Sequence, residues 1–328
     1  MKQDTDDMTL KPFDFSQILE EVPEIGKFAV KIDSFSFEPP IDSSDVEPSL
    51  WQKLACLIKD KYDDYDGFII LHGTDTMAYS ASALSFMLDG LTKPVIFTGS
   101  QLPIGVPRTD GRENLISAVE IASAKDENGN PAVPEVCVCF ASLLMRGNRS
   151  TKVNSEGFRA FQSPNFPPLA EAGINIRYNN EYIRKPNDWL QNLSINTNLD
   201  TRVSILKIHP GITPQVVRNI LCGEETRAVI METYGSGNAP SSKWFLDILE
   251  EVKAMDKIVV NVTQCLAGTV NMNLYATGKH LEESGVIDGN DLTTESALAK
   301  LFYLMGKSQD NAWVRAMMGR NLKGEISK

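Results

Sequence analysis

The sequence predicts an α/β protein of two domains, and three observations lead to this prediction. Short apolar runs alternate with segments of helical periodicity along most of the 328 residues. Several runs are continuously apolar, as in strands that are buried on both faces of a parallel sheet. A polar stretch at residues 183–199 interrupts the alternation and is interpreted as a linker. We therefore expect a larger N-terminal domain at residues 1–182, with a largely parallel sheet flanked by helices, and a smaller α/β domain at residues 200–328.

The elements of the N-terminal domain alternate in a β-α order. A helix is expected at 51–62, where Trp51, Leu54 and Ile58 share one face. The apolar run 67–71 is the first expected strand, and small apolar residues up to Leu88 form the helix after it, which stops before a glycine. The remaining expected elements are a strand at 94–97 that ends in the polar turn Thr98-Gly99-Ser100-Gln101, a helix at 113–124 and a strand at 136–140.

The same alternation resumes after the linker. Ser241 and Ser242 are candidate caps of one helix. The expected strands are 203–208, 228–232 and 257–262, and the expected helices are 214–221, 243–254, 294–307 and 310–320. No internal repeat is visible.

Composition excludes several classes of protein. The formal net charge is −11 and no basic patch stands out, which argues against a nucleic-acid or anionic-membrane partner. No apolar run approaches the roughly 20 residues of a membrane helix. The first residues, Met1 to Asp7, are polar and acidic and do not form a secretory signal. We expect a cytoplasmic protein.

Cysteine and histidine usage argues against a disulfide framework and a metal centre. The five cysteines have no framework spacing, which indicates free thiols in a reducing compartment. Cys137 and Cys139 lie two apart on an expected strand and are interpreted as small buried apolar residues. The three histidines, His72, His209 and His280, are far apart in sequence, so a zinc site is not expected.

A strand-to-helix turn at Thr74-Asp75-Thr76 is the best candidate for a functional site. It comes directly after an apolar strand, and ligands of open α/β sheets bind at the carboxyl ends of strands. The structural alternative is a helix N-cap, in which one of these side chains satisfies free amide groups. One residue would suffice for a cap, so the cluster favours a function.

Two further polar segments are considered as parts of a functional site only because the Thr74–Thr76 turn is a candidate. Asp42, Ser43 and Ser44 are ordinary turn residues, and by themselves they are better explained as a solvated turn. The segment 146–152 comes after a strand, and its alternative is an exposed basic loop. Together the segments suggest a hydroxyl nucleophile, because a hydroxyl needs a neighbouring base at neutral pH. Thr74 with Lys152 and Asp75 offers the required groups.

At these residues the chain resembles the cytoplasmic bacterial-type (type I) L-asparaginases. The resemblance covers essentially the whole chain, and several long strings recur in order. The matching strings are Asp64 to Tyr79 (DYDGFIILHGTDTMAY), Lys93 to Gln101 (KPVIFTGSQ), Arg146 to Lys152 (RGNRSTK), Ser163 to Leu169 (SPNFPPL), Tyr234 to Pro240 (YGSGNAP), Thr263-Gln264-Cys265 and Tyr275 to Gly278 (YATG).

The resemblance implies hydrolysis of L-asparagine to L-aspartate and ammonia through an acyl-threonine intermediate. It implies no metal or organic cofactor, and a homodimer or homotetramer. Residue by residue, Thr74 and Asp75 match the second catalytic threonine and its carboxylate neighbour, and Lys152 matches the lysine that activates the threonine hydroxyl. Asp42, Ser43 and Ser44 match the segment that holds the α-amino and α-carboxylate groups of the substrate.

One departure concerns the nucleophile. Family members open with a strand that ends in Thr-Gly-Gly-Thr-Ile-Gly and carries the attacking threonine, and no such string occurs here. The segment from Leu10 already resembles the family just beyond that loop. We therefore expect Met1 to be an internal methionine of a longer protein, and a first strand to be missing beside an exposed sheet edge. Thr5 and Thr9 do not lie in a glycine-rich turn, so neither is proposed as the nucleophile.

A second departure concerns regulation. In a type I member, the position two residues before Tyr-Gly is an arginine that helps to bind a second, allosteric asparagine. Glu232 occupies this position here, which reverses the sign of the interaction with a carboxylate. We expect weak or absent activation by asparagine even though the possible allosteric residues Thr151 and Cys265 remain.

Two other functions compete with this one. A degenerate homologue that binds an amide or amino acid without turning it over is the main alternative. A dinucleotide-binding domain is disfavoured, because no Gly-x-Gly-x-x-Gly comes after the first strands. The preference for asparagine over glutamine stays open, because it rests on pocket shape.

Overall fold

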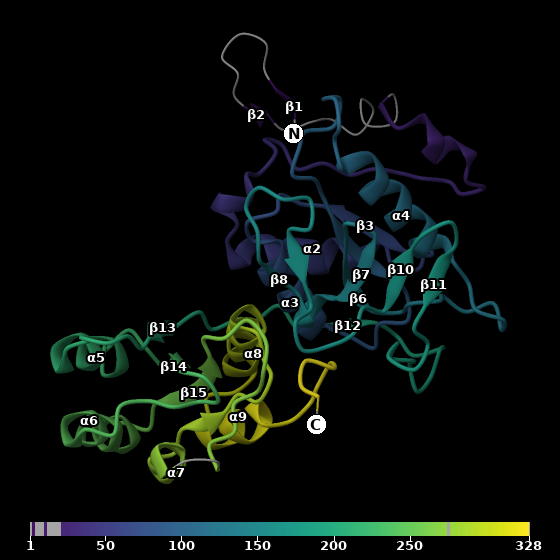
Figure 1. Cartoon of the computed structure of the whole chain (residues 1–328). Coiled ribbons are helices and arrows are strands. Elements are labelled where there is room, and N and C mark those ends of the chain that lie inside the picture. The colour runs from purple at the N-terminus through teal and green to yellow at the C-terminus, as the bar shows by residue number, and fades with distance from the viewer. Residues whose placement is uncertain (1, 4–9, 12–20, 274–275, 328) are drawn as a thin grey trace. The chain divides into compact units, whose positions relative to one another are not determined.

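The computed structural model describes residues 2–3, 10–11, 21–273 and 276–327 (Figure 1). It divides into two compact units: unit 1 comprises residues 1–163 and 167–195, and unit 2 comprises residues 164–166 and 196–328. Thr5, Thr9 and Tyr275, which the sequence brought into consideration, lie outside the described residues. The first described strands, β1 (Lys2–Gln3) and β2 (Leu10–Lys11), form a short antiparallel pair.

Unit 1 is built on a six-stranded sheet in the order β11-β10-β7-β6-β5-β3. The three predicted strands, β3 (Phe68–Leu71), β5 (Val95–Thr98) and β6 (Val136–Phe140), run parallel. Three further strands, β7 (Leu143–Arg146), β10 (Ala170–Ala172) and β11 (Ile176–Tyr178), each pair antiparallel with a neighbour. The sheet thus has a parallel part, β3, β5 and β6, and an antiparallel part that begins where β6 returns through a tight turn into β7.

The register of the parallel strands brings two polar turns to one edge. Leu71 pairs with Thr98, the last residues of β3 and β5. The chain leaves both strands at the same level, so the turns after them are neighbours. This is the edge at which ligands bind in open α/β sheets.

Helices flank this sheet. Helix α3 (Met77–Met87) is buried over nearly its whole length, which explains its small, apolar composition, and it packs against β6 and α2 (Pro48–Asp60). Helix α4 (Gly111–Ser123) packs against β5. The shorter elements of unit 1 are η1 (Pro23–Lys27), η2 (Ser43–Asp45), β4 (Leu88–Asp89), η3 (Gly147–Arg149), β8 (Thr151–Lys152), β9 (Phe161–Gln162) and β12 (Ser194–Ile195).

The polar stretch interpreted as a linker is shared between the two units. Residues 183–195 belong to unit 1, and residues 196–199 belong to unit 2. The first part is held to unit 1 because β12 pairs with β4 and the Lys59 ammonium donates to the Leu193 carbonyl at 2.5 Å. The short segment 164–166, within a predicted N-terminal domain, belongs to unit 2.

Unit 2 holds a four-stranded sheet in the order β13-β14-β15-β16, and all its pairs are parallel. The strands are β13 (Val203–Lys207), β14 (Ala228–Thr233), β15 (Ile258–Thr263) and β16 (Ile287–Asp288). The helices are α5 (Pro214–Leu221), α6 (Lys243–Ala254), α7 (Ala276–Glu283), α8 (Thr294–Lys307) and α9 (Asn311–Met318). The bounds of α5, α6 and α8 agree with the predicted ranges, whereas α7 and β16 were not predicted.

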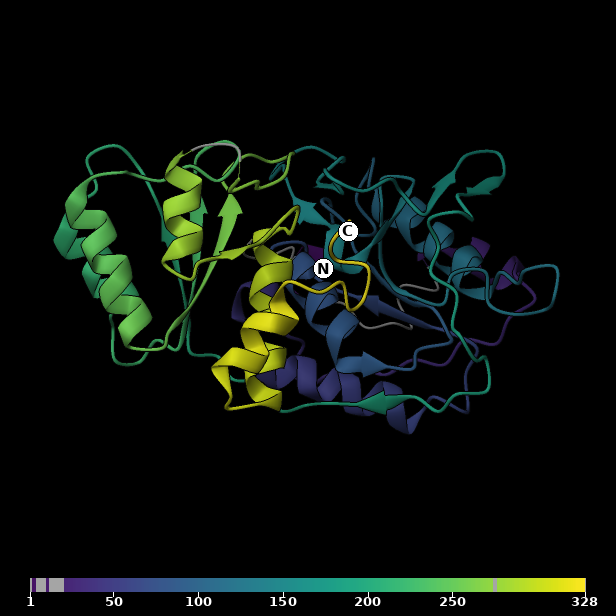
Figure 2. The ribbon, with the colours of Figure 1, turned by 90° about the horizontal axis from the view of Figure 1, so that it is seen from below.

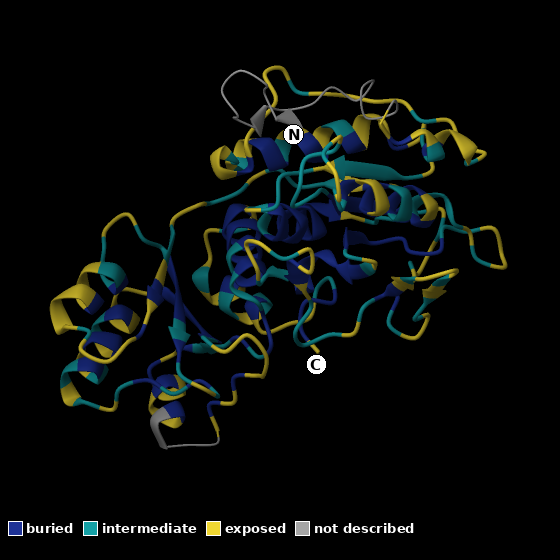
Figure 3. Ribbon diagram, turned by 45° about the horizontal axis from the view of Figure 1, so that its top comes forward, coloured by how far each residue is buried: buried dark blue, intermediate teal, exposed yellow. Residues whose placement is uncertain are grey.

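Burial in unit 2 matches the amphipathic pattern of these helices. Helices α5 and α6 lie side by side (Figure 2). Their apolar faces cover an interior that includes Val229, Phe245 and Val259, while their outer faces are exposed (Figure 3). No helix among the described residues is both long enough and apolar enough to cross a membrane.

Strand β3 lies at one end of the unit 1 sheet. Within the described part of the chain, only β5 pairs with it. Its four residues are only partly buried, and Leu71 is 40% exposed, although the run was expected to be a buried strand. Among the described residues, β3 is therefore an edge strand of this sheet.

Candidate functional site

The turn after β3 presents Thr74 and Asp75 at the carboxyl edge of the unit 1 sheet. Thr76 occupies the N-cap position of α3, but its side chain makes no capping hydrogen bond. Its hydroxyl instead donates to the Ser43 carbonyl at 2.7 Å. The capping alternative therefore does not explain the cluster of Thr74, Asp75 and Thr76.

Lys152 reaches this turn from a segment 78 residues away in sequence. Its ammonium nitrogen lies 2.8 Å from Thr74 Oγ1 and 2.6 Å from Asp75 Oδ1. The lysine side chain is 19% exposed and the Asp75 side chain is 64% exposed, so the ion pair is open to solvent on the carboxylate side. The three residues that the sequence grouped by chemistry are thus in direct contact.

The segment before Lys152 is not the exposed basic loop of the alternative interpretation. Arg146, Arg149 and Ser150 are buried. The Arg146 guanidinium forms an ion pair with Glu135, with Nε 2.7 Å from Oε2, and donates to the Tyr182 carbonyl. This buried ion pair anchors the start of the segment 146–152, from which Lys152 approaches Thr74.

Gln101 joins the cluster and was not singled out from the sequence. Thr74 Oγ1 donates to Gln101 Oε1 at 3.3 Å, and the Gln101 amide donates to the Gly157 carbonyl at 3.2 Å. The Asp110 carboxylate accepts from the backbone N–H of Gln101 at 3.0 Å and thereby ties this turn to the start of α4. The sequence did offer a signal for Gln101, because it lies in a polar turn at the end of β5, the strand next to β3.

The segment 42–44 packs directly against the Thr74 turn. The Asp42 carboxylate accepts from both the Ser44 amide and the Ser44 hydroxyl, each at 2.8 Å. These two bonds lower the pKa of Asp42 below its usual value and keep the carboxylate charged. Ser43 is buried, and a Cβ added at Gly73 would meet its Oγ at 2.4 Å. Only glycine permits this approach.

Taken together, these side chains make a site for chemistry on a hydroxyl. The Lys152 ammonium and the Gln101 side-chain amide contact the Thr74 hydroxyl, and the Asp75 carboxylate pairs with that ammonium. A second carboxylate, Asp42, lies on the adjoining segment. The amine form of a lysine can take the proton of a neighbouring hydroxyl, and a carboxylate can bind a cationic group of a ligand. Among the described residues, no cluster of three or more His, Cys, Asp or Glu side chains could hold a metal ion.

The residues considered for regulation belong to different units. Thr151 is part of β8 in unit 1, whereas Glu232 and Cys265 belong to unit 2. The Glu232 carboxylate accepts from the Thr294 hydroxyl at 2.7 Å and lies 3.4 Å from the Lys207 ammonium. Cys265 is exposed.

The strand cysteines are buried as predicted. Cys137 and Cys139 lie on β6, and burial raises the pKa of the Cys139 thiol to about 12. Such a thiol stays protonated and is a poor nucleophile. Neither cysteine takes part in the site.

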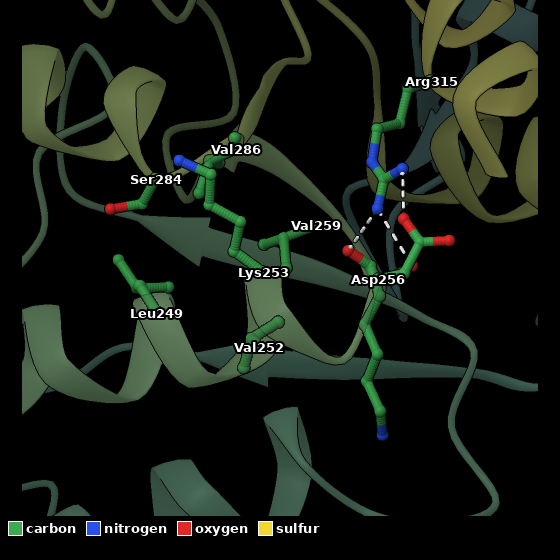
Figure 4. Close-up of a pocket in the computed structure, with 10 residues that line it drawn as sticks. Leu249, Val252, Lys253, Asp256, Val259, Ser284, Val286 and Arg315 are labelled. Atoms are coloured by element: carbon green, nitrogen blue, oxygen red, sulfur yellow. Dashed lines mark hydrogen bonds and ion pairs between the residues drawn. The ribbon is translucent and has the colours of Figure 1, made fainter.

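A separate cavity of about 270 Å³ lies in unit 2 between α6, β15, the turn before β16, and α9 (Figure 4). Its floor is apolar and includes Val252, Val259 and Val286. Its polar side chains already have partners within unit 2. Arg315 is paired with Asp256 at 2.8 Å, and the Lys253 ammonium donates to the Glu283 carbonyl. None of the residues singled out from the sequence lines this cavity.

Comparison with known proteins gives consistent results over both units. The family model described as "Asparaginase, N-terminal" matches residues 1–184, and that described as "Glutaminase/Asparaginase C-terminal domain" matches residues 202–318. Over 305 residues the chain is 46% identical to L-asparaginase 1 of Escherichia coli strain K12, covering 93% of this chain and 86% of that protein.

Two further similarities come from another relative and a solved structure. The crystal structure of L-asparaginase I from Vibrio cholerae matches with a TM-score of 0.86 and 42% identity, covering 96% of this chain and 92% of that one. The 60 kDa lysophospholipase of Homo sapiens is 42% identical over 294 residues, which cover 88% of this chain but only 49% of that protein.

Proposed function

The chain belongs to the asparaginase family, and from this premise we propose that it hydrolyses the side-chain amide of L-asparagine to L-aspartate and ammonia. The similar proteins from Escherichia coli, at 46% identity, and Vibrio cholerae, at 42% identity, carry the name asparaginase. The proposal rests above all on one observation: the Lys152 ammonium lies between Thr74 Oγ1 at 2.8 Å and Asp75 Oδ1 at 2.6 Å. That arrangement is what proton removal from a hydroxyl requires.

The proposed reaction passes through an ester of threonine. Lys152, as the amine, accepts the proton of the Thr74 hydroxyl, and the Asp75 carboxylate stabilises the ammonium that forms. The Thr74 oxygen in turn takes the hydroxyl proton of the attacking threonine. The oxygen of that attacking threonine bonds to the amide carbon of the substrate, and the proton passes to the departing nitrogen, so that ammonia leaves. Water then hydrolyses the aspartyl ester, which releases L-aspartate and restores the hydroxyl.

Asp42, Ser43 and Ser44 would hold the amino-acid end of the substrate. The Asp42 carboxylate suits the α-ammonium group, and its lowered pKa keeps it charged in mildly acidic solution. The serine hydroxyls and amides suit the α-carboxylate. The contact of Thr76 with Ser43 supports this assignment, because it fixes the binding segment to the catalytic turn.

A binding protein without turnover is the weaker hypothesis. A pocket that only binds asparagine has no use for a lysine in contact with both a hydroxyl and a carboxylate. An exposed ion pair of this kind contributes only about 0–1 kcal/mol to stability. The contacts of Lys152 are therefore better explained by chemistry than by folding.

The test is hydrolysis of L-asparagine by the protein purified from its source cells, with L-glutamine as the comparison substrate. We expect release of ammonia and L-aspartate in equal amounts. Acid quenching and subsequent peptide mapping should find an aspartyl ester on a threonine other than Thr74, because the resemblance gives Thr74 the second role. Binding of asparagine without ammonia release would favour the binding protein, and an ester on Thr74 would overturn its assigned role.

We also propose that asparagine does not activate this protein through the position of Glu232. A ligand carboxylate placed there would meet a negative charge that Thr294 and Lys207 already hold in place. The rate should therefore depend hyperbolically on asparagine concentration. A sigmoidal curve that becomes hyperbolic in the Thr151→Ala or Cys265→Ala variant would contradict this.

The remaining expectations concern location and assembly. We propose a cytoplasmic homodimer or homotetramer, as the resemblance implies. Light scattering coupled to size-exclusion chromatography distinguishes the two assemblies, and a monomeric mass would reject both.

A further inference from the structure

His72 lies directly between β3 and the catalytic turn, and both of its ring nitrogens are engaged. Its backbone N–H donates to the Thr98 carbonyl at 2.9 Å, which continues the ladder between β3 and β5. Ring Nδ1 lies 2.7 Å from the Gly73 carbonyl oxygen, and ring Nε2 lies 2.9 Å from Ser80 Oγ on α3. Ser80 Oγ in turn accepts from the Trp51 indole N–H at 2.9 Å.

The partners of the ring determine its tautomer. A carbonyl oxygen can only accept, so Nδ1 must carry the proton that is donated to Gly73. Nε2 of the neutral ring is then an acceptor and takes the hydroxyl proton of Ser80. That leaves the lone pairs of Ser80 for the indole N–H of Trp51, which can only donate. Each group therefore donates to the next, from the Trp51 indole through Ser80 and His72 to the Gly73 carbonyl, and no donor or acceptor in this series lacks a partner.

The surroundings of the ring keep it neutral. Trp51, Ser80 and Phe97 are buried, and the centroid of the Phe97 ring lies 5.7 Å from the centroid of the imidazole. Among the described residues, the groups that contact the ring from α3 and β5 and from the turn itself carry no charge. Burial lowers the pKa of His72 below 6.5, although the bond to Gly73 opposes this shift.

The bond to Gly73 matters because Thr74 is the next residue in the chain. The Gly73 carbonyl belongs to the same planar peptide as the Thr74 N–H, so fixing the oxygen fixes the plane that carries Thr74. Gly73 has no side chain, which leaves its backbone unusually free to rotate. A side chain at this position would clash with Ser43, so the backbone of Gly73 must be held rigid by its hydrogen-bond partners instead.

We propose that His72 is a positioning residue, which uses its Nδ1–H bond to the Gly73 carbonyl to hold the Thr74 hydroxyl against Lys152, and that the Trp51–Ser80 pair holds the ring for this task. The inference rests on the proposed function, in which Thr74 belongs to the catalytic cluster. His72 does not touch the substrate in this role. It supplies orientation, and a small misplacement of a reacting group can cost about 10²-fold in rate.

Two variants at one position separate this role from simple packing. The amide nitrogen of asparagine lies where Nδ1 lies in histidine, so His72→Asn can still donate to Gly73. The amide of glutamine reaches the position of Nε2 instead, so His72→Gln can meet Ser80 but not Gly73. We expect His72→Gln to lose about 10²-fold in kcat with KM little changed, and His72→Asn to stay within about fivefold of the parent, the equivalent of one ordinary hydrogen bond.

The far end of the chain of hydrogen bonds is tested by Ser80→Ala. Its matched control is Ser85→Ala, because Ser85 is a buried serine of the same helix whose hydroxyl donates only within α3, to the Ala81 carbonyl at 2.7 Å. Ser80→Ala should lower kcat, whereas Ser85→Ala should not. Equal effects of the two serine variants would reject a role for the Trp51–Ser80 pair.

A spectroscopic readout keeps the inference testable without turnover. With only three histidines in the chain, ring nitrogen NMR signals can be assigned by comparison with His72→Asn. We expect protonated Nδ1 and unprotonated Nε2 at pH 7. In threonine-labelled protein, the Thr74 amide signal should shift in His72→Gln and stay near its place in His72→Asn.

The outcomes separate the two proposals. Failure of the parent protein to hydrolyse asparagine would reject the proposed function and leave the Thr74 amide signal as the test of positioning. The inference is overturned if the ring carries its proton on Nε2, if the Thr74 signal is indifferent to His72→Gln, or if His72→Gln retains as much kcat as His72→Asn.

Discussion

Lys152 is the residue on which the site depends. Its ion pair with Asp75 is largely open to solvent on the carboxylate side, and such pairs add little to stability. We therefore propose a chemical rather than a structural explanation for its contact with Thr74 Oγ1. Removal of either partner should consequently affect turnover far more than folding.

We expect Thr74→Ala and Lys152→Met each to lower kcat by about 10²–10⁴-fold, the usual worth of a proton-transfer group. Steady-state kinetics on L-asparagine measures this, and thermal unfolding checks that the fold survives. Lys185→Met is the matched control, because Lys185 donates to a carbonyl of unit 1, that of Ala132, without touching the site. A near-normal kcat in either site variant would reject the assigned roles.

At the scale of elements, the site depends on the close approach of two strand ends. The turn after β5 passes so near the end of β3 that a Cβ added at Gly99 would meet the His72 carbonyl oxygen at 2.3 Å. The Asn114 amide on α4 holds the Gly99 carbonyl at 3.0 Å. The backbone atoms that would clash cannot move aside without separating β3 from β5.

Gly99→Ala should therefore destabilise the protein by about 1–3 kcal/mol, as overpacking does, and also lower kcat because it displaces His72. Urea unfolding measures the first effect. Gly26→Ala is the control, since nothing lies within 4 Å of a Cβ added there, and it should change stability by no more than about 0.5 kcal/mol. Equal stability of the two variants would refute this account of the strand ends.

At the scale of the whole molecule, each unit has its own interior. The interior of unit 2 contains a buried ion pair that joins α8 to the C-terminal segment. Lys300 on α8 and Glu325 near the C-terminus are both fully buried, with Nζ 2.6 Å from Oε1. Lys300 also donates to the carbonyls of Met318 and Arg320. Burial by itself would raise the pKa of Glu325, but the Lys300 ammonium and two backbone N–H groups outweigh it and lower the pKa.

Lys300→Met should cost about 3–5 kcal/mol, because it leaves a buried carboxylate without its counter-ion. Hydrogen exchange resolved by peptide should then become faster in α8, α9 and the last residues, and not in unit 1. Lys243→Met removes an exposed pair with Asp247 in the same unit and should have little effect. Faster exchange throughout both units would show that the two interiors do not unfold independently.

The sequence by itself determined most of the parallel strands, most of the helices and the chemical types of most site residues. These features are local: apolar runs such as Val136–Phe140, helical periodicity, and polar residues clustered at Thr74–Thr76. The antiparallel additions β7, β10 and β11 escaped prediction, because their short segments carry little periodic signal.

Only the tertiary structure decided which of the candidate side chains meet. Lys152 contacts Thr74 because a buried arginine anchors the start of its segment, and Gln101 enters the site because the register of β3 and β5 places their turns side by side. The hydrogen bonds from Trp51 through Ser80 to His72 likewise join three separate elements. Such contacts depend on strand register and packing across long stretches of chain, which a local pattern of residues does not encode.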